Sequence, residues 1–254
     1  MMGRVDLNAD VGESFGAYVL GQDQALIAVV SSANVACGFH AGDPSVMRAT
    51  VRLAREHHVA VGAHPGFPDL VGFGRRDMQV APGQLEDLVA YQIGALTAIA
   101  TAEGMALRHV KPHGALYNMA ARDRALADAI ARAVVNVDRT LSLFAPPASA
   151  LLAAGMEAGL TTVSEVFADR AYRADGSLVP RSQPGAVIHD EVAVVARTLD
   201  MVREQAVTAI DGTRVPIRAE TICVHGDTPD AAHLARRLRD ALQQTGVAVA
   251  APGP

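Results

Sequence analysis

Lysine is the scarcest charged residue of this sequence. The 22 basic side chains are 21 arginines and the single Lys111. A phosphate-binding P-loop has the pattern GxxxxGK[ST], in which backbone amides and the lysine hold phosphate oxygens. Pro112 follows the only lysine, so the sequence excludes a P-loop.

Tryptophan is absent, and the net charge is −5 with no run of basic residues. Domains that bind nucleic acid usually carry a basic patch or stripe. We therefore expect no nucleic-acid partner.

Cysteine is also scarce, with Cys37 and Cys223 as the two examples. Two distant cysteines form neither a disulfide framework nor a metal-binding pair of short spacing. Each lies in an apolar run that ends in a histidine, which indicates reduced, buried thiols and a cytoplasmic protein.

Long apolar runs are missing too. Asp6 and Asp10 stand where a signal peptide would need apolar residues. The longest uncharged stretches, 24–42 and 140–156, are interrupted by Ser, Asn, Gly or Pro and make poor membrane spans. We expect a protein without leader or membrane contact.

The sequence does contain a regular alternation of short β-like runs and longer helical patterns, over a length of 254 residues that suffices for one large core. Strands are predicted at 5–10, 32–38, 59–64, 108–113, 141–145, 161–167 and 221–227, with helices at 45–58, 83–104, 124–137 and 230–246. This alternation predicts a parallel sheet. Seven units favour an α/β fold with a seven-stranded parallel β/α barrel over residues 1–254 as a single domain. An open doubly wound sheet is the alternative.

Three connections stand out from this pattern. The segments 66–78 and 168–185 are long and rich in Gly, Pro and Arg, and both follow predicted strands. In a barrel they would cover the catalytic face as lids, and the simpler alternative is tolerated surface insertions. The Asp-Gly pair within 207–217 predicts a β-hairpin.

Polar residues follow six of the seven predicted strands. Side chains two apart share one face of a strand, which groups Asn8 with Asp10, and Lys111 with His113. Further groups at or beyond strand ends are His40, His64, Glu165, His225 and Asp227. The carboxyl ends of parallel barrel strands surround one mouth, so we expect these side chains to form the site there.

Some polar residues have simpler structural interpretations. Asp43 precedes Pro44 and a predicted helix, so an N-cap is favoured over a catalytic role. Asp6 begins a buried strand and either bonds locally or joins the site. His109 lies at the start of its strand, away from the mouth, and is expected in the core.

Lys111 has two possible roles. It either neutralises neighbouring carboxylates or acts on a substrate as a compact cation whose pKa can shift, which arginine cannot do. Asp10, His40 and His64 form a tentative ligand set for zinc or manganese. The usual short metal-binding spacings are absent, and we expect no tightly bound metal. A serine-hydrolase elbow, GxSxG, is absent as well.

Seven stretches resemble the LamB/YcsF family: DLNADVGESFG, SANVACGFHAGDP, GAHPGFPDLVGFGRR, HVKPHGALYN, EVFADRAY, LVPRSQPGA and TICVHGD. They follow the same order along almost the whole chain. The resemblance implies a β/α barrel related to the glycoside hydrolase and deacetylase barrels. It also implies ATP-dependent opening of 5-oxoproline to L-glutamate with partner subunits B and C. FAPPASA (144–150) departs from it, because a glycine-rich turn is expected there.

Together the residues and the resemblance predict a site. The predicted catalytic residues are Asp10, Lys111, His113 and Glu165, and the predicted substrate-binding residues are Asn8, Glu13, His40, His64, Tyr117, Asn118, Arg181, His225 and Asp227. ATP is expected as a co-substrate of the complex, 5-oxoproline as the ligand, and a homo-oligomer is possible. Two other functions stay open: a metal-dependent amidohydrolase or deacetylase acting alone, and a non-catalytic subunit that binds 5-oxoproline.

Overall fold

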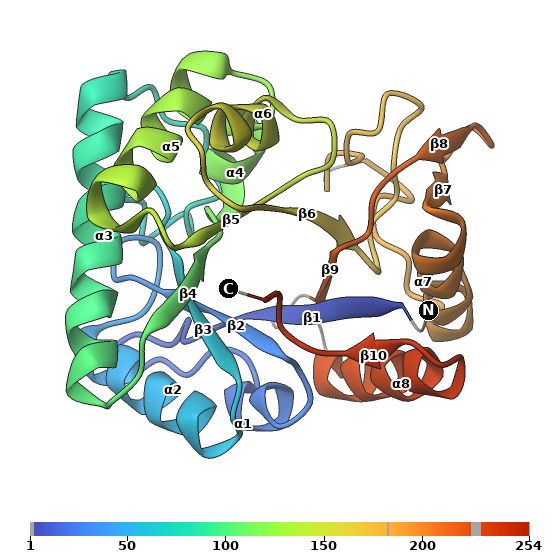
Figure 1. The fold of residues 1–254 in the computed structure, drawn as a ribbon, viewed down its shortest axis with the longest axis horizontal. Coiled ribbons are helices and arrows are strands. Elements are labelled where there is room, and N and C mark those ends of the chain that lie inside the picture. The colour runs from blue at the N-terminus through green and yellow to red at the C-terminus, as the bar shows by residue number, and fades with distance from the viewer. Residues whose placement is uncertain (1–2, 182, 225–229, 254) are drawn as a thin grey trace.

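Seven parallel strands close into a barrel in the computed structural model, which describes residues 3–181, 183–224 and 230–253. They are β1 (Arg4–Val11), β2 (Ser32–Ala36), β3 (Ala60–His64), β4 (Leu107–Val110), β5 (Ser142–Ala145), β6 (Thr162–Phe167) and β9 (Thr221–Val224). Each strand pairs with the next in chain order, and β1 pairs with β9 to close the ring. The short β10 (Ala248–Val249) adds to the free end of β1 (Figure 1). The predicted barrel is confirmed and the open sheet is wrong.

All seven predicted strands belong to the barrel, and several end earlier than predicted. β4 stops at Val110, which leaves Lys111 and His113 on the connection that follows it. β2 likewise ends at Ala36, before His40. The predicted last residues of the seventh strand, 225–227, lie outside the described residues.

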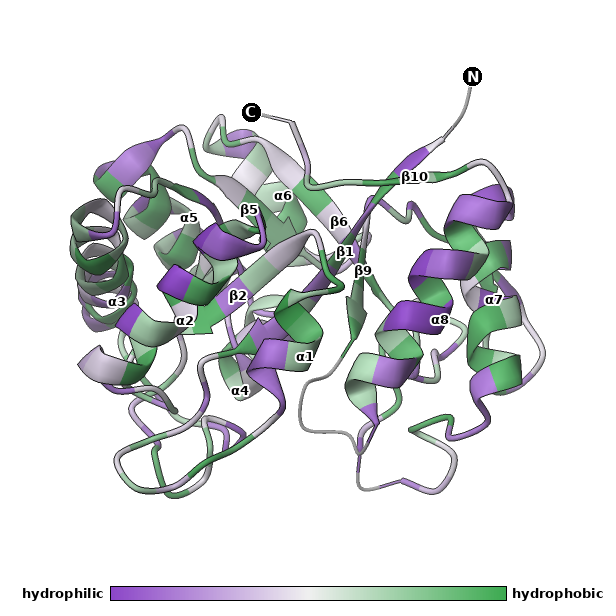
Figure 2. Cartoon of the chain, turned by 90° about the horizontal axis from the view of Figure 1, so that it is seen from below, coloured by the Kyte–Doolittle hydropathy of each residue, from purple (hydrophilic) through white to green (hydrophobic). Residues whose placement is uncertain are grey.

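Helices cover the outside of the barrel (Figure 1). They are α1 (Asp23–Ile27), α2 (Pro44–Glu56), α3 (Pro82–Ala102), α4 (Gly114–Ala120), α5 (Arg124–Asp138), α6 (Ala150–Glu157), α7 (Glu191–Glu204) and α8 (Ala231–Gln244). Hydrophilic and hydrophobic residues alternate along α7 and α8, as expected for helices with one buried side (Figure 2). Asp43 caps α2 by accepting hydrogen bonds from the backbone of Ser45 and Val46 at 2.7 and 3.0 Å, so the predicted N-cap is confirmed.

The barrel interior is filled by side chains. His109 is buried, its Nε2 lies 2.7 Å from Oδ1 of Asn34, and its ring stacks on Phe144 at 4.2 Å. The predicted core position of His109 is confirmed. Gly62 on β3 leaves the space that this ring occupies, because a Cβ there would lie 2.2 Å from the imidazole. Asp6 is also buried and accepts hydrogen bonds from three hydroxyl groups, those of Ser31, Ser32 and Thr221.

The connections that follow the strands gather at the end of the barrel opposite to the two termini (Figure 2). Segment 66–78 folds over this end, where the carbonyl of Gly74 accepts a hydrogen bond from the backbone of Ala115. The predicted hairpin is confirmed as the antiparallel pair β7 (Ala206–Thr208) and β8 (Arg214–Pro216). Within the described ranges, no helix has the length and apolar character needed to cross a membrane.

Candidate active site at the carboxyl ends of the strands

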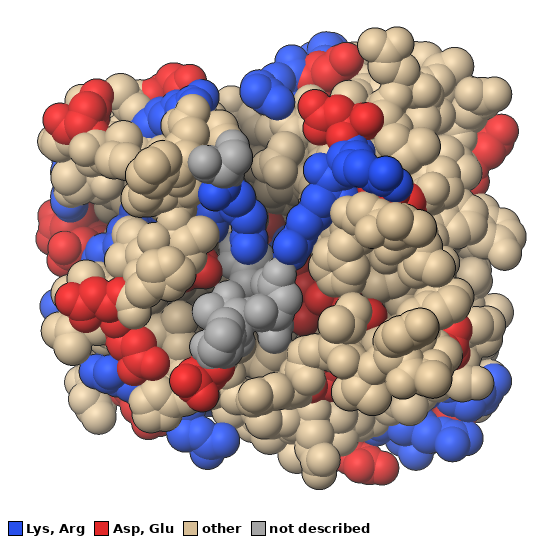
Figure 3. Space-filling view, turned by 180° about the vertical axis from the view of Figure 1, so that it is seen from behind, with Lys and Arg blue, Asp and Glu red and all other residues tan. Residues whose placement is uncertain are grey.

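A cavity of about 400 Å³ opens at the carboxyl ends of the strands. Figure 3 looks onto this end of the barrel, where basic side chains converge on a central hollow. Both long connections line it, one through Arg75 and Asp77 and the other through residues 176–181. The predicted position of these connections over the catalytic face therefore agrees with the structure. Pro146 and Pro147, from the stretch that departs from the family pattern, also line the cavity.

Lys111 lies at the floor of this cavity between two carboxylates. Its Nζ is 2.8 Å from Oδ1 of Asp10 and 3.0 Å from Oε1 of Glu165. It also donates to Sγ of Cys223 at 3.1 Å, and its side chain is only 3% exposed. A linear ammonium fits between these acceptors, whereas a planar guanidinium would need more room.

The electrostatics of this cluster favour the charged forms of Lys111 and Asp10. Burial acts to lower the pKa of Lys111, but the carboxylates of Asp10 and Glu165 outweigh it and raise that pKa well above its ordinary value. Burial likewise acts to raise the pKa of Asp10, and the neighbouring His64 and Lys111 hold it well below the ordinary value. These directions favour a charged ammonium at Lys111, and its role toward a substrate stays a prediction.

Glu165 is held by three donors. Tyr117 donates its hydroxyl to Oε2 at 2.7 Å, and Asn8 donates its side-chain amide to Oε1 at 3.0 Å, opposite Lys111. Burial and the neighbouring Glu165 raise the pKa of Tyr117 well above its ordinary value, so this phenol stays a hydrogen-bond donor. Since its oxygens are already bonded, Glu165 is suited to orienting Lys111 and Tyr117.

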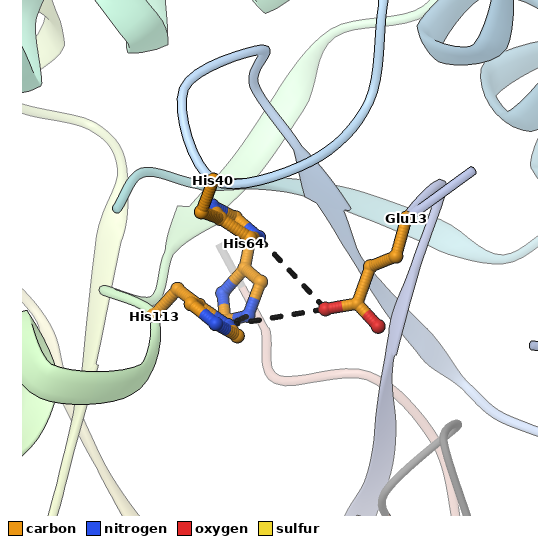
Figure 4. Close-up of side chains that lie close together, drawn as sticks. All are labelled: Glu13, His40, His64 and His113. Carbon is orange, nitrogen blue, oxygen red and sulfur yellow. Dashed lines mark hydrogen bonds and ion pairs between the residues drawn. The ribbon is translucent and has the colours of Figure 1, made fainter. Parts of the chain in front are cut away.

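A second cluster lies beside the first and contains Glu13, His40, His64 and His113 (Figure 4). One ligand atom from each residue lies within 4.8 Å of all the others. Nε2 of His64 is 2.9 Å from Nδ1 of His113, and the ring of His40 stacks on His113 at 3.8 Å. Oε1 of Glu13 lies 3.8 Å from Nε2 of His40 and 3.9 Å from Nδ1 of His113.

Segment 66–78 presses against this second cluster and needs glycine to do so. A Cβ on Gly66 would lie 2.6 Å from Nδ1 of His40. A Cβ on Gly74, whose φ is +62°, would lie 2.7 Å from Cβ of His40 and 2.9 Å from Cδ2 of His113. The carbonyl of Phe73 completes this contact at 2.8 Å from Nε2 of His113. The segment therefore fixes the positions of both imidazoles.

The structure brings most of the predicted site residues together. Those that line the cavity are Asp10, His64, Lys111, His113, Tyr117, Asn118, Glu165 and Arg181. The predicted substrate contact of Asn8 is corrected by the structure. Its side chain is fully buried below the cavity and is bonded to Glu165, Thr221 and Asn34, so it supports the site without reaching a ligand. Glu13 and His40 lie behind the cavity wall, in the histidine cluster. His225 and Asp227 lie outside the described residues.

The structure also changes which residues form the candidate metal-binding group. His40 and His64 belong to the histidine cluster, but the other two members are His113 and Glu13. Asp10 lies next to it, with Oδ2 at 3.3 Å from Nε2 of His64, and is committed to Lys111 through Oδ1. The four members of the cluster come from four separate parts of the chain, so no short motif could reveal them.

Four arginines of the site were not predicted. Arg75, Arg122, Arg170 and Arg173 line the cavity together with Arg181. Arg170 is anchored by donating to the backbone carbonyls of Val179 and Ala186. For Arg75, Arg170 and Arg173 the concentration of arginine in the two long connections was the available signal, because lid segments that carry arginine can bind an anion.

The fold and the cavity together define a parallel β/α barrel protein with a cavity lined by charged side chains at the carboxyl ends of its strands. The model of the LamB/YcsF family matches residues 5–253, and the chain belongs to this family.

Two relatives show how closely the chain follows the family. It is 57% identical over 250 residues to a protein of Symbiobacterium thermophilum named as the A subunit of 5-oxoprolinase, with 98% of this chain and 96% of the relative covered. The crystal structure of a lactam utilization protein from Thermus thermophilus superimposes with a TM-score of 0.94 at 52% identity, covering 98% of this chain and 100% of that one.

A more distant structure shares the fold alone. The catalytic domain of a peptidoglycan N-acetylglucosamine deacetylase from Eubacterium rectale matches with a TM-score of 0.52 at 11% identity, over 98% of this chain and 88% of that one. The expected relation to deacetylase barrels is thereby confirmed at the level of the fold.

Proposed function

We propose that this chain is the A subunit of an ATP-dependent 5-oxoprolinase, which opens 5-oxo-L-proline to L-glutamate together with partner subunits B and C. One observation carries the proposal. A buried carboxylate–ammonium–carboxylate cluster, Asp10–Lys111–Glu165, lies at the floor of an arginine-lined cavity. The chain that contains it is more than half identical, along nearly its whole length, to a protein that carries the name of this 5-oxoprolinase component.

The cavity suits a small anion with an amide group. 5-Oxoproline carries one carboxylate, and guanidinium groups bind carboxylates in a bidentate manner. We assign the substrate carboxylate to the cavity arginines, with Arg181 and Arg75 as the first candidates. The volume of about 400 Å³ falls in the usual range of small-molecule sites and exceeds that of a single five-membered lactam. The remaining space would admit a phosphoryl group on the lactam oxygen.

The chemistry explains the coupling to ATP. An unactivated five-membered lactam is a poor electrophile, and phosphorylation of its carbonyl oxygen would make the ring carbon reactive. Water then adds to that carbon, the carbon–nitrogen bond breaks, and the ring nitrogen gains a proton to become the amino group of glutamate. The product of this step is an acyl phosphate of glutamate, and a second water displaces its phosphate. One 5-oxoproline, one ATP and two waters thus give glutamate, ADP and phosphate.

The described residues divide these tasks. Asp10 lines the cavity as a carboxylate and would accept a proton from the attacking water. Lys111 presents a fixed positive charge to the oxygen that becomes negative in the transition state. Glu165 keeps Lys111 and Tyr117 in place, and His113 lines the same cavity beside them.

ATP use would require the partner subunits. The sequence has no P-loop, so we assign ATP use to the partner subunits. The activated substrate would then be exchanged with a partner, which needs a cavity with an open mouth. We place the complex in the cytoplasm, where reducing conditions suit the two buried, free thiols, Cys37 and Cys223.

The test is reconstitution of the complex from this chain and its two separately purified partner subunits. We expect glutamate and ADP to form in equal amounts only when all three subunits, 5-oxoproline and ATP are present. Asp10→Asn should still bind 5-oxoproline, as measured by calorimetry, yet fail to support turnover. Normal turnover in this variant would instead favour a non-catalytic binding subunit.

A metal-dependent amidohydrolase that acts alone is the second candidate. The observation that favours it is the cluster of three histidines and one glutamate beside the cavity. Glutamate release by this chain alone, without ATP and with a divalent metal added, would replace the first proposal by this one.

A further inference from the structure

The imidazole rings of His64 and His113 face each other through two nitrogen atoms that both carry lone pairs. Nδ1 of His64 lies 2.7 Å from the carbonyl oxygen of Lys111, and Nε2 of His113 lies 2.8 Å from the carbonyl oxygen of Phe73. Carbonyl oxygens only accept, so each of these nitrogens carries a proton and donates it. The remaining nitrogens, Nε2 of His64 and Nδ1 of His113, are lone-pair acceptors when the rings are neutral. They nevertheless approach to 2.9 Å, which calls for either a proton shared between them or a metal ion beside them.

The third imidazole of the cluster is that of His40. His40 is completely buried, and neither of its ring nitrogens has a hydrogen-bond partner among the described residues. A buried polar group without a partner is costly, and such groups in native proteins commonly have a partner not yet accounted for. Nε2 of His40 points toward Glu13 and the facing pair, as Figure 4 shows. A cation in this space would supply the missing partner of Nε2 and leave Nδ1 to carry the ring proton.

The surrounding charge favours a cation as well. The carboxylate of Glu13 lies within 3.9 Å of both His40 and His113, and that of Asp10 lies 3.3 Å from His64. We propose that Glu13, His40, His64 and His113 bind one divalent transition-metal ion. Three imidazole nitrogens with one carboxylate oxygen suit zinc, and cobalt(II) is an informative substitute.

The spacing of the donor atoms agrees with a tetrahedral site. Two ligands at about 2.0–2.1 Å from zinc, at a tetrahedral angle, lie about 3.4 Å apart. The observed separations of 2.9, 3.8 and 3.9 Å lie on either side of this value. All four ligand atoms lie within 4.8 Å of one another, so the side chains would have to rotate to bind one ion. The ring of His40 would have to leave its parallel stack on His113, because one ion cannot lie in the planes of both rings.

The second layer of the site is already in place. Histidines that bind metal usually donate their other ring nitrogen to a carbonyl or carboxylate, which fixes the tautomer and orientation. His64 and His113 do so through the carbonyls of Lys111 and Phe73, and Gly66 and Gly74 confine the ring of His40. The backbone therefore holds all three imidazoles in position.

The geometry favours a bound metal, although the sequence predicted none that is tightly held. His64 and His113 line the cavity, so a ligand could reach an ion held by them if the ion took a fifth ligand or lost one of the four protein ligands. Such an ion would polarise an oxygen of that ligand. Metal binding by these residues does not depend on which reaction the cavity serves, so failure of ring opening would leave it standing.

The first experiment measures the wild-type chain, expressed without a polyhistidine tag and purified without chelators. Elemental analysis should find close to one transition-metal equivalent per chain. After chelation, cobalt(II) should restore one equivalent and give visible absorption bands of a nitrogen–oxygen site without a thiolate band. Metal should also raise the melting temperature, since it binds the folded state. A wild-type chain that neither retains nor rebinds zinc or cobalt overturns the proposal and leaves a shared proton between His64 and His113.

The second experiment locates the ion. His40→Gln and His113→Gln should each weaken zinc binding by about 100-fold or more, because changes even in supporting residues cost about 10–100-fold. His57→Gln is the matched control, since His57 is exposed at the end of α2 and is not a member of the cluster. Unchanged zinc affinity in both cluster variants would place the ion elsewhere and refute the assignment. Anomalous scattering from wild-type crystals grown with zinc gives the same answer if the variants do not fold.

Discussion

At the scale of single residues, Lys111 illustrates why this chain keeps one lysine among its basic side chains. Its ammonium touches Asp10, Glu165 and Cys223 in a space that is closed to solvent. A buried ion pair whose partner is removed leaves an uncompensated charge and costs about 3–5 kcal/mol. The same residue therefore affects stability and chemistry together, unlike a group at an exposed barrel mouth.

The change from Lys111 to arginine separates these two effects. Lys111→Arg keeps the charge but misplaces it, so we expect turnover of the reconstituted complex to fall by about 100-fold or more. Lys111→Met removes the charge and should lower both turnover and the melting temperature. Thermal unfolding should thus rank the wild type first, Lys111→Arg second and Lys111→Met last. Near-normal turnover in Lys111→Arg would show that Lys111 serves charge balance alone.

At the scale of elements, the packing inside the barrel depends on complementary side-chain sizes on β3 and β4. Gly62 of β3 faces the ring of His109 on β4, which in turn stacks on Phe144 of β5. The two stacked rings fill the space that Gly62 leaves, so the interior has no room there for an added methyl group.

Gly62→Ala tests this packing. The new Cβ would lie 2.2 Å from the imidazole of His109, so the ring or the strand must move. Added methyl groups in a packed core typically cost about 1–3 kcal/mol, and we expect the free energy of unfolding in urea to fall by that amount. Gly94→Ala on α3 is the control, because a Cβ there meets nothing within 4 Å and should stabilise the helix by up to about 1 kcal/mol. Equal stability of the two variants would contradict the packing interpretation.

At the scale of the whole molecule, Asp6 lies where the barrel closes. Its carboxyl group accepts from Ser31 and Ser32 on one side and from Thr221 of β9 on the other, so it joins β1 to both of its neighbours. Burial raises its pKa from 3.8 to about 6, against the effect of the three hydroxyl donors.

This shift predicts how stability depends on pH. Between pH 4 and 6 the folded chain keeps the proton of Asp6 while the unfolded chain has lost it, so stability should fall as pH rises through this window. The full loss is of order 3 kcal/mol, from about two pKa units at about 1.4 kcal/mol each. Asp6→Asn should remove this part of the slope in urea unfolding measured at several pH values. An identical slope in the variant would show that Asp6 does not titrate in this window.

Local sequence determined much of this protein. The alternation of strands and helices, the N-cap at Asp43, the hairpin at 206–216 and the polar residues that follow the strands depend on neighbouring residues and were predictable. The closure of β1 on β9 joins residues more than 200 positions apart, and the family resemblance supported it where local pattern could not.

Only the tertiary structure decided which side chains meet. It buried Asn8 beneath the cavity, clamped Lys111 between two carboxylates, and set His64 against His113 with Glu13 behind them. These distances follow from the register of the closed barrel and from the path of segment 66–78. Both are set by contacts between distant segments, and a sequence read along the chain specifies the order of residues without their separations in space.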